Sequence, residues 1–463
     1  MSTPPSSSSS PPSPSLEGAA GGRVGPPASS SSSSRSRMRS GDEVWPEPFI
    51  EALALRVATD ASRNLGRLYS AQALSNIFQV CSTWHATSWS DLLWRHLTQR
   101  VWNADTLLHD SWRDEYIHRH RTANNFRLSR AAYTPLYFYP AANNENNDGL
   151  ACRRLALSDR HLAAGFANGA VHLYRLPDGA HLSAFHPTPR QDRLGRFSGA
   201  VAGIVLTDVR VVFATLGGDV HVANLGDGVG PTPPLRRAYA GDVVNDGVLV
   251  DFTGCERWWV GLYAGTCVPG HGLRVWNRVT EELVFVGGTL TDPEAVTGWH
   301  MLTEPTQPIG RVRITSHGRM AVACTSVRVI VFDLESHVGM ILGEEEFQRE
   351  IIVGSFDTVN ESTLMVDARG SATIRRVPTL EESCGFLVRG SRLGLGEVLG
   401  SVNGGYGVVL VNGVVKVWDI EVGRYLYRFR ETIGDCSALV TDDRYVAAYS
   451  TDGTIHLWDF GLS

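Results

Sequence analysis

The sequence predicts a mainly β protein, in which a seven-bladed β-propeller over about residues 129–463 follows a small all-α domain and a disordered N-terminal tail. Three observations support this prediction. Serine, proline and glycine dominate the first 41 residues. Near residue 130 the spacing of apolar residues changes from a helical period to alternation. From there on, a unit of apolar strand, short turn, apolar strand and polar turn recurs seven times.

Residues 1–41 contain very little apolar surface and include an unbroken serine run at 29–34. Because such a segment cannot offset its ordering entropy by burial, we expect it to stay disordered. Its end, "RSRMRS" at 35–40, is basic. This short cluster is compatible with a nuclear import signal and equally with a solvated tail.

Residues 42–128 have the apolar spacing of helices. In "SAQALSNIFQVCSTWH" we expect one apolar stripe on a single helix, formed by Leu74, Ile77, Phe78, Cys81 and Trp84. Ser90 and Asp110 are expected to cap two further helices, since their side-chain oxygens can accept hydrogen bonds from free helical N–H groups. The first of these two helices has leucine or valine at 93, 97 and 101.

The seven units of the β zone can be aligned on the apolar residue that precedes an aromatic slot. These residues are Leu173, Val222, Val275, Val331, Ile374, Val417 and Leu457. Successive positions are 40 to 56 residues apart. That spacing is typical of one four-stranded propeller blade, so seven blades are expected.

The last unit lacks the strand that follows each earlier unit. It ends "TDGTIHLWDFGLS", and its apolar strand would present an adhesive sheet edge if it stayed unpaired. One spare β-like segment, "YTPLYFY" at 133–139, precedes the first unit. We therefore expect 133–139 to pair with 454–460, which closes the ring and fixes the helical domain to the propeller.

Charge and cysteine content narrow the protein's class. The net charge of −6 gives no general reason to expect nucleic-acid binding, and only the basic tail favours DNA contact. Seven scattered cysteines without a C-x-x-C pair indicate a reducing, intracellular compartment and argue against structural zinc. No apolar run approaches the length of a membrane-spanning helix.

Enzymatic interpretations find little support. No G-x-S-x-G, P-loop or H-E-x-x-H motif occurs, and "GLGEVLG" at 394–400 lies between predicted strands. His118 and His120 are two residues apart on a predicted helix and face different sides. Cys255 has no identifiable base, so a buried thiol is favoured. We expect a non-catalytic protein without cofactor or metal.

The β zone resembles the WD-repeat family in diverged form. The Trp-Asp dipeptide occurs at 418–419 and 458–459, and Asp333 occupies the same acidic slot. A kelch propeller is the alternative. Its glycine doublets should recur in register, whereas those at 217–218 and 404–405 fall at different points of the unit.

The helical zone resembles the F-box. The strings "VWPEPFIEALALRVA" and "LSNIFQVCSTWHATSWSDLLWRHL" carry its proline, its Val-Cys-x-x-Trp step and its closing Leu-Trp. This resemblance implies binding to a Skp-type adaptor of a cullin–RING ubiquitin ligase. The implied adaptor-binding residues are Pro46, Ile50, Leu53, Val80, Cys81, Trp84, Leu93 and Trp94.

Beyond the tail, the chain resembles the plant STERILE APETALA family. The resemblance rests on the segments 45–126, 242–265 and 285–300 and on the terminal "IHLWDFG". It implies the substrate receptor of a ubiquitin ligase in the nucleus, controlling flower development and organ size. The implied substrates are PEAPOD-type transcriptional repressors with their KIX-domain partners.

The propeller rim is the expected substrate-binding surface. In WD-repeat proteins the connections between blades share a face with the central turns, and that face usually binds partners. Arginine and tryptophan anchor interfaces, although solvated loop residues are an alternative reading. The candidate residues are Arg190, Arg193, Arg196, Phe197, Asp242, Asp246, Trp299 and His300. A transcriptional co-regulator scaffold without ubiquitin chemistry remains the alternative function.

Overall fold

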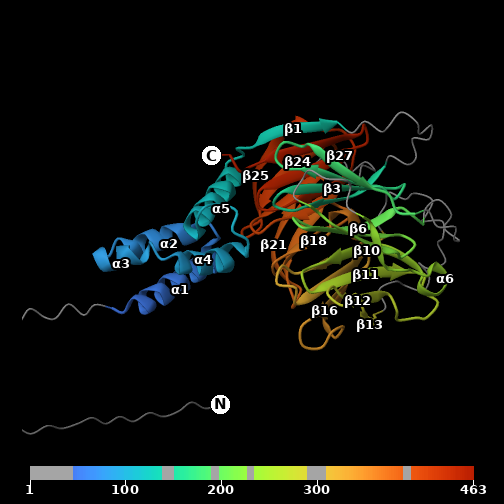
Figure 1. Ribbon diagram of the computed structural model, residues 1–463, viewed down its shortest axis with the longest axis horizontal. Coiled ribbons are helices and arrows are strands. Elements are labelled where there is room, and N and C mark those ends of the chain that lie inside the picture. Colours follow the sequence, from blue (N-terminus) through green and yellow to red (C-terminus); the bar gives the residue numbers. More distant parts are fainter. Residues whose placement is uncertain are drawn as a thin grey trace, which may run out of the picture. The chain divides into compact units, whose positions relative to one another are not determined.

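The computed structural model describes residues 45–137, 151–188, 198–226, 234–288, 309–388 and 398–462. Residues 46–463 form one compact unit, in which a helical segment precedes seven four-stranded antiparallel sheets (Figure 1). The fold is mainly β, as the sequence predicted, and it is a seven-bladed propeller.

The helical segment has the following elements: α1 (Glu47–Leu65), α2 (Tyr69–Phe78), α3 (Ser82–Thr87), α4 (Asp91–Trp102) and α5 (Trp112–Arg127). Ser90 caps α4 as predicted, because its Oγ accepts a hydrogen bond from Leu93 N at 3.3 Å. The prediction for α5 was wrong by one residue. Ser111, not Asp110, has the extended backbone of a cap and accepts from Asp114 N at 3.1 Å.

The predicted apolar stripe of residues 74–84 is interrupted. Helix α2 ends at Phe78 and α3 begins at Ser82, so the chain turns where one continuous helix was expected. Leu74 and Ile77 are buried, whereas Cys81 is exposed. Residues on either side of this turn belong to different helices, so the three- and four-residue spacing no longer places their side chains on one face.

The sheets form in chain order, except that the last one takes its outer strand from before the first. Their strands are β2 (Cys152–Leu157), β3 (His161–Phe166), β4 (Val171–Arg175), β5 (His181–Phe185); β6 (Val201–Thr207), β7 (Arg210–Thr215), β8 (Val220–Asn224), β9 (Arg236–Tyr239); β10 (Val248–Gly254), β11 (Trp258–Ala264), β12 (Leu273–Asn277), β13 (Leu283–Gly287); β14 (Gly310–Ile314), β15 (Met320–Thr325), β16 (Arg328–Asp333), β17 (Ile341–Glu346); β18 (Asp357–Val359), β19 (Ser362–Val366), β20 (Ser371–Arg376), β21 (Glu381–Leu387); β22 (Leu399–Val402), β23 (Tyr406–Val411), β24 (Val414–Asp419), β25 (Arg424–Thr432); and β26 (Cys436–Thr441), β27 (Tyr445–Ser450), β28 (Thr454–Asp459) with β1 (Ala132–Tyr137).

The first strand of each blade lies innermost and packs against its counterparts in the two neighbouring blades. Strand β2 thus packs against β6 on one side and against β26 on the other, which completes the ring. The blade cores are apolar and aromatic, with Trp259, Trp276 and Phe332 fully buried between sheets. Burial of these large side chains between blades is what holds the ring together.

Strand β1 closes the ring by pairing antiparallel with β28. Tyr133 lies opposite Trp458, and its Oη is 2.8 Å from His456 Nδ1. The structure therefore contains the pair expected between 133–139 and 454–460. Residues 138 and 139 lie outside the described residues.

The end of α5 is packed against the last blades. Phe126 stacks on Tyr406 with a ring separation of 4.8 Å and on Phe460 at 4.2 Å. Asn125 Nδ2 donates to the carbonyl oxygens of Phe460 and Leu462, each at 3.0 Å. Aromatic packing and these hydrogen bonds join the helices firmly to the propeller.

The helices lie against the face that carries the turns between the first and second strands of the blades. Arg67 pairs with Asp443 in the β26–β27 turn, and Thr106 Oγ1 donates to Asp159 in the β2–β3 turn at 3.2 Å. Because antiparallel strands alternate in direction, the connections from one blade to the next lie on the opposite face. The propeller thus offers its interblade connections on the face opposite helices α1 to α5.

Candidate functional site

The end of the helical segment away from the propeller is built from the start of α1, the end of α2, α3 and the start of α4 (Figure 1). Helix α2 packs against both α1 and α3. The Ser90 hydroxyl donates to the Glu51 carboxylate, which ties the N-terminus of α4 to the N-terminal half of α1. Four chain segments therefore meet at this end.

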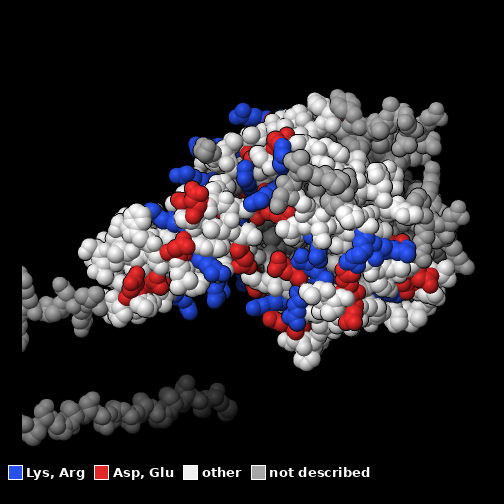
Figure 2. All heavy atoms as spheres, viewed as in Figure 1, with Lys and Arg blue, Asp and Glu red and all other residues white. Residues whose placement is uncertain are grey.

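Large apolar side chains are exposed on these segments. The exposed fraction is 61 % for Val80, 66 % for Trp89 and 54 % for Leu92, and Phe49 and Cys81 are also exposed. We call these five residues the helical-end surface. Figure 2 shows that uncharged residues gather at this end of the molecule. Exposed apolar surface of this kind typically marks a partner-binding site.

The predicted adaptor-binding residues divide into two groups. Pro46, Val80 and Cys81 are exposed, and Leu53 and Trp84 are half-buried. The remaining residues are buried: Ile50, Leu93 and Trp94. Leu93 and Trp94 belong to the apolar core of the helical segment.

For the buried group, the part in adaptor binding stays a prediction, because its side chains lie inside the helical segment and not on its surface. Ile50 is 0 % exposed. Trp94 donates from Nε1 to the Ser88 carbonyl at 2.7 Å, which accounts for its one polar group.

Sequence reasoning missed Phe49, Trp89 and Leu92 as exposed residues. For Phe49 and Leu92, the helical spacing of the neighbouring buried residues indicated the exposure. Leu92 directly precedes Leu93 in the buried stripe of α4, and Phe49 directly precedes the buried Ile50 in α1. Neighbours in a helix point about 100° apart, so the residue just outside a buried stripe faces another side of the helix.

Two of the predicted rim residues lie in the connection from β9 to β10, on the face opposite the helices. Asp242 caps the short helix α6 (Val243–Asp246) by accepting from Val244 N at 3.0 Å. Asp246 forms an ion pair with Arg274 at 2.7 Å. Both carboxylates therefore have structural partners. The other predicted rim residues lie outside the described residues: Arg190, Arg193, Arg196, Phe197, Trp299 and His300.

The described residues contain no group of three or more His, Cys, Asp or Glu side chains placed to hold a metal ion. All seven cysteines are free thiols. Among the described helices, none has the length and apolar character needed to cross a membrane.

No family model matches the chain. Its sequence is 52 % identical over 434 residues to a protein of Arabidopsis thaliana described as "Transcriptional regulator STERILE APETALA", with 92 % of this chain and 95 % of the relative covered. The chain belongs to the STERILE APETALA family. The β-propeller fold of this chain and the description of its STERILE APETALA relative as a regulator are both consistent with a non-catalytic protein.

Two solved structures are similar to this STERILE APETALA family member. The computationally designed Ika8 protein is 16 % identical with a TM-score of 0.44, and it is matched over 68 % of this chain and 98 % of its own. The β-propeller domain of Cps50 (Swd1) from Myceliophteria thermophila is 13 % identical with a TM-score of 0.47, over the same shares of both chains.

Proposed function

We propose that this STERILE APETALA family member is the substrate-recognition subunit of a nuclear cullin–RING ubiquitin ligase. The helical-end surface binds a Skp-type adaptor, and the propeller face opposite the helices binds transcriptional repressors of the PEAPOD and KIX type. In this role it controls flower development and organ size. The observation that carries the proposal is the exposed apolar helical-end surface on a segment that resembles the F-box.

The chemistry of the helical-end surface supports binding to another protein. Trp89, Leu92 and Val80 together expose aromatic and aliphatic side chains that would gain free energy if a partner removed them from water. Tryptophan is enriched among the residues that dominate interface affinity. Arg113 lies 4.6 Å from the Trp89 ring, which limits the conformations of that exposed side chain. A partly ordered anchor loses less entropy when it binds.

The firm junction between helices and propeller supports a receptor role. A ligase receptor has to hold its target at a fixed distance from the adaptor, and a flexible hinge would prevent this. Phe126 is 0 % exposed between Tyr406 and Phe460, so the last helix is part of the propeller's own core. The two binding surfaces therefore lie on opposite sides of one packed unit.

The proposal is tested by recovery of a Skp-type adaptor with purified full-length variants. Leu92→Glu places a carboxylate in the apolar surface, and it does so in the first turn of α4, where an acidic side chain favours the helix. Leu128→Glu is the matched control, because Leu128 is 49 % exposed at the end of α5, near the propeller. We expect Leu92→Glu to lose the adaptor and Leu128→Glu to retain it.

Equal adaptor recovery by both variants would refute the helical-end surface as the binding site. Alanine replacement of Ile50 is a poorer test, because it opens a cavity in the helical core and can abolish binding by unfolding.

A transcriptional co-regulator scaffold is the second candidate function, favoured by the description of the relative as a transcriptional regulator. Such a scaffold binds repressors without changing their abundance. Proteasome inhibition separates the two functions: the receptor predicts that bound repressors accumulate, and the scaffold predicts unchanged levels.

A further inference from the structure

Three histidines lie close to one another on the outer strands of the first blade. His172 belongs to β4, His181 is the first residue of β5, and His186 follows the last residue of β5. The rings of His172 and His181 lie 5.2 Å apart, and those of His172 and His186 lie 6.2 Å apart. We call these three residues the histidine cluster. Imidazole is the side chain that most often binds transition-metal ions.

A β-bulge between β4 and β5 brings His181 to the side of the sheet that His172 occupies. His172 lies opposite Ala184, and Tyr174 lies opposite His181, because the register shifts by one residue between these two pairs. Residues opposite each other in an antiparallel pair point to the same face, and so does every second residue of a strand. Without the shift, His181 would point to the other face of the blade.

The nearest nitrogens of the two rings are already close to the spacing of a metal chelate. His172 Nδ1 lies 3.0 Å from His181 Nε2, in a hydrogen bond between the two imidazoles. Two histidine nitrogens that bind one tetrahedral Zn²⁺ at about 2.0–2.1 Å stand about 3.3 Å apart. A shift of a few tenths of an ångström therefore converts the pair into a chelate, in which each ring carries its proton on its other nitrogen.

Aromatic side chains beneath the cluster hold the two rings in place. Phe166 contacts the His172 ring edge-on at 5.4 Å, and Tyr174 contacts the His181 ring edge-on at 5.3 Å. Both aromatic side chains are buried. Rings that are already held in place lose less entropy when they bind an ion. His181 and His186 are exposed, so a hydrated ion can reach the pair and the His186 side chain can turn toward it.

The protonation state of the cluster suits metal binding. Burial, with contributions from the neighbouring imidazoles of His181 and His186, lowers the pKa of His172 to about 4. Burial also lowers the pKa of His181 below its usual value of 6.5. Both rings are therefore neutral at neutral pH, and only a neutral imidazole offers a lone pair to a metal ion.

We propose that the histidine cluster binds one Zn²⁺ ion through His172 Nδ1 and His181 Nε2, with His186 as the third ligand and water in the remaining position. The three rings are not a complete coordination set as they stand, because His186 joins only after its side chain turns. Imidazole is a preferred ligand of Zn²⁺, which accepts tetrahedral geometry. The ion joins β4 to β5 and does not depend on the proposed ligase role.

The test is a calorimetric titration of the full chain with ZnCl₂ at neutral pH in a buffer without chelators. We expect saturable binding and a rise in the melting temperature with Zn²⁺ concentration. His181→Gln removes a direct ligand from an exposed position, so it should weaken the Zn²⁺ affinity at least about tenfold without disturbing the blade core. Absence of saturable binding by the unmodified chain would overturn the proposal.

His96→Gln is the matched control, because His96 is exposed on α4 and the substitution is the same. It should leave the Zn²⁺ affinity unchanged, and equal affinities for His181→Gln and His96→Gln would overturn the site. His186→Gln tests the third ligand. It should also weaken the affinity, and an unchanged value would overturn the three-histidine assignment.

Cobalt(II) separates the histidine cluster from the exposed thiols of Cys81 and Cys267, since thiolates also bind zinc. Thiolate ligands give cobalt a strong charge-transfer absorption in the near ultraviolet, and imidazole ligands do not. We expect visible cobalt bands without this absorption, and we expect His181→Gln to lose them. A thiolate-type spectrum that His181→Gln leaves unchanged would overturn the assignment to the histidine cluster.

Discussion

Arg67 and Asp443 form a two-point ion pair between the helical segment and the propeller. Arg67 Nη1 lies 3.0 Å from Asp443 Oδ2, and Arg67 Nη2 lies 2.8 Å from Asp443 Oδ1. The pair joins residues 376 positions apart. The Arg67 guanidinium also lies 5.0 Å from the Trp102 ring, so one side chain contacts both parts of the junction. The neighbouring Arg67 lowers the pKa of Asp443, although burial alone would raise it.

Arg67→Met should destabilise the helix–propeller junction by about 2 to 3 kcal/mol, because it leaves Asp443 without its counter-charge. The measurement is denaturant unfolding of the full chain, with hydrogen exchange of α1 and α2 as a local readout. In a double-mutant cycle with Asp443→Leu, the second change should cost much less in the Arg67→Met background. Additive costs would contradict direct coupling.

Two adjacent glycines give an independent test of the same ion pair. A Cβ at Gly404 would lie 2.3 Å from the Arg67 guanidinium, whereas at Gly405 the nearest atom of Arg67 is 4.0 Å away. Gly404→Ala should therefore displace Arg67 and weaken the junction, and Gly405→Ala should not. Hydrogen exchange of α1 and α2 in the two variants makes the comparison. Equal protection in both would show that the guanidinium position does not matter.

The closing strand can be tested with two truncated chains that differ only in β1. A chain starting at residue 129 keeps β1, and a chain starting at residue 138 leaves β28 as an open edge. We expect the shorter chain to self-associate and the longer one to remain monomeric, because unpaired strand edges recruit other strands. Light scattering during size-exclusion chromatography measures this. Equal monomer content would mean that β1 is dispensable for closure.

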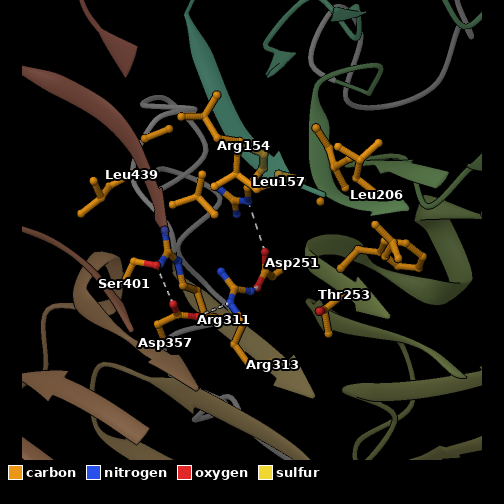
Figure 3. A pocket seen from close by; sticks show the side chains of 18 of the residues that line it. Arg154, Leu157, Leu206, Asp251, Thr253, Arg311, Arg313, Asp357, Ser401 and Leu439 are labelled. Atoms are coloured by element: carbon orange, nitrogen blue, oxygen red, sulfur yellow. Dashed lines mark hydrogen bonds and ion pairs between the residues drawn. The ribbon is translucent and has the colours of Figure 1, made fainter. Parts of the chain in front are cut away.

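Asp251→Asn should destabilise the propeller by about 3 to 5 kcal/mol. Asp251 is fully buried and accepts from Arg154, from Arg313 and from Val312 N (Figure 3). The change therefore takes the carboxylate partner from the buried Arg154 and leaves the half-buried Arg313 paired with Asp357 alone. Asp60→Asn, in an exposed pair with Arg56 on α1, should cost less than about 1 kcal/mol. Denaturant midpoints compare the two, and similar small shifts would show that the inner ion pairs contribute little.

Asp442 should make the stability of the protein depend on pH. Burial, with a smaller contribution from Asp443, raises the pKa of Asp442 from 3.8 to about 7. Between these values the folded chain holds a proton that the unfolded chain does not, so the contribution to stability falls as pH rises from about 4 to 7. Asp442→Asn removes this loss and keeps an oxygen that can accept from Arg444 N, at 2.7 Å in the structure.

The stability of Asp442→Asn relative to the unmodified chain should therefore increase with pH, by at most about 1.4 kcal/mol per unit within that window. The contribution of His118 to the stability of the fold changes with pH in the opposite direction. Burial lowers its pKa to about 4, so its contribution is lost as pH falls from 6.5 toward 4. Urea unfolding of the variant should then show a steeper loss of stability on acidification. Asp435→Asn controls for the loss of an exposed carboxylate, and a pH-independent difference for Asp442→Asn would contradict the prediction.

Much of the propeller could be predicted from the sequence because each blade has a strand–turn–strand pattern within a short stretch of the chain. The two central strands of a blade alternate in polarity around a short turn, as in the unit that ends at Trp458. The closing strand followed from the physical cost of an open edge. Local competition between neighbouring residues was harder to predict: Ser111 and Asp110 can both cap a helix, and only the backbone decides between them.

The functional surfaces were less predictable. Matching a family motif selects positions such as Ile50 and Leu93 without stating which way each side chain points, and both proved to be core residues. The ion pairs between the innermost strands were missed for another reason. Arg154, Asp251 and Arg313 stand on the innermost strands of separate blades, so their meeting depends on the closure of the whole ring. Aligning the first strands of the units would have revealed charged residues at comparable positions, such as Asp251 and Arg313.

The pairing of β1 with β28 also sets the order of events during synthesis. Tyr133 leaves the ribosome 323 residues before its partner His456, so β1 has to wait while six blades form. Translation that stops early yields a ring with two open edges, which is the kind of species that chaperones and proteases recognise. Only a chain that has been translated through β28 can pair β1 and so cover both open strand edges.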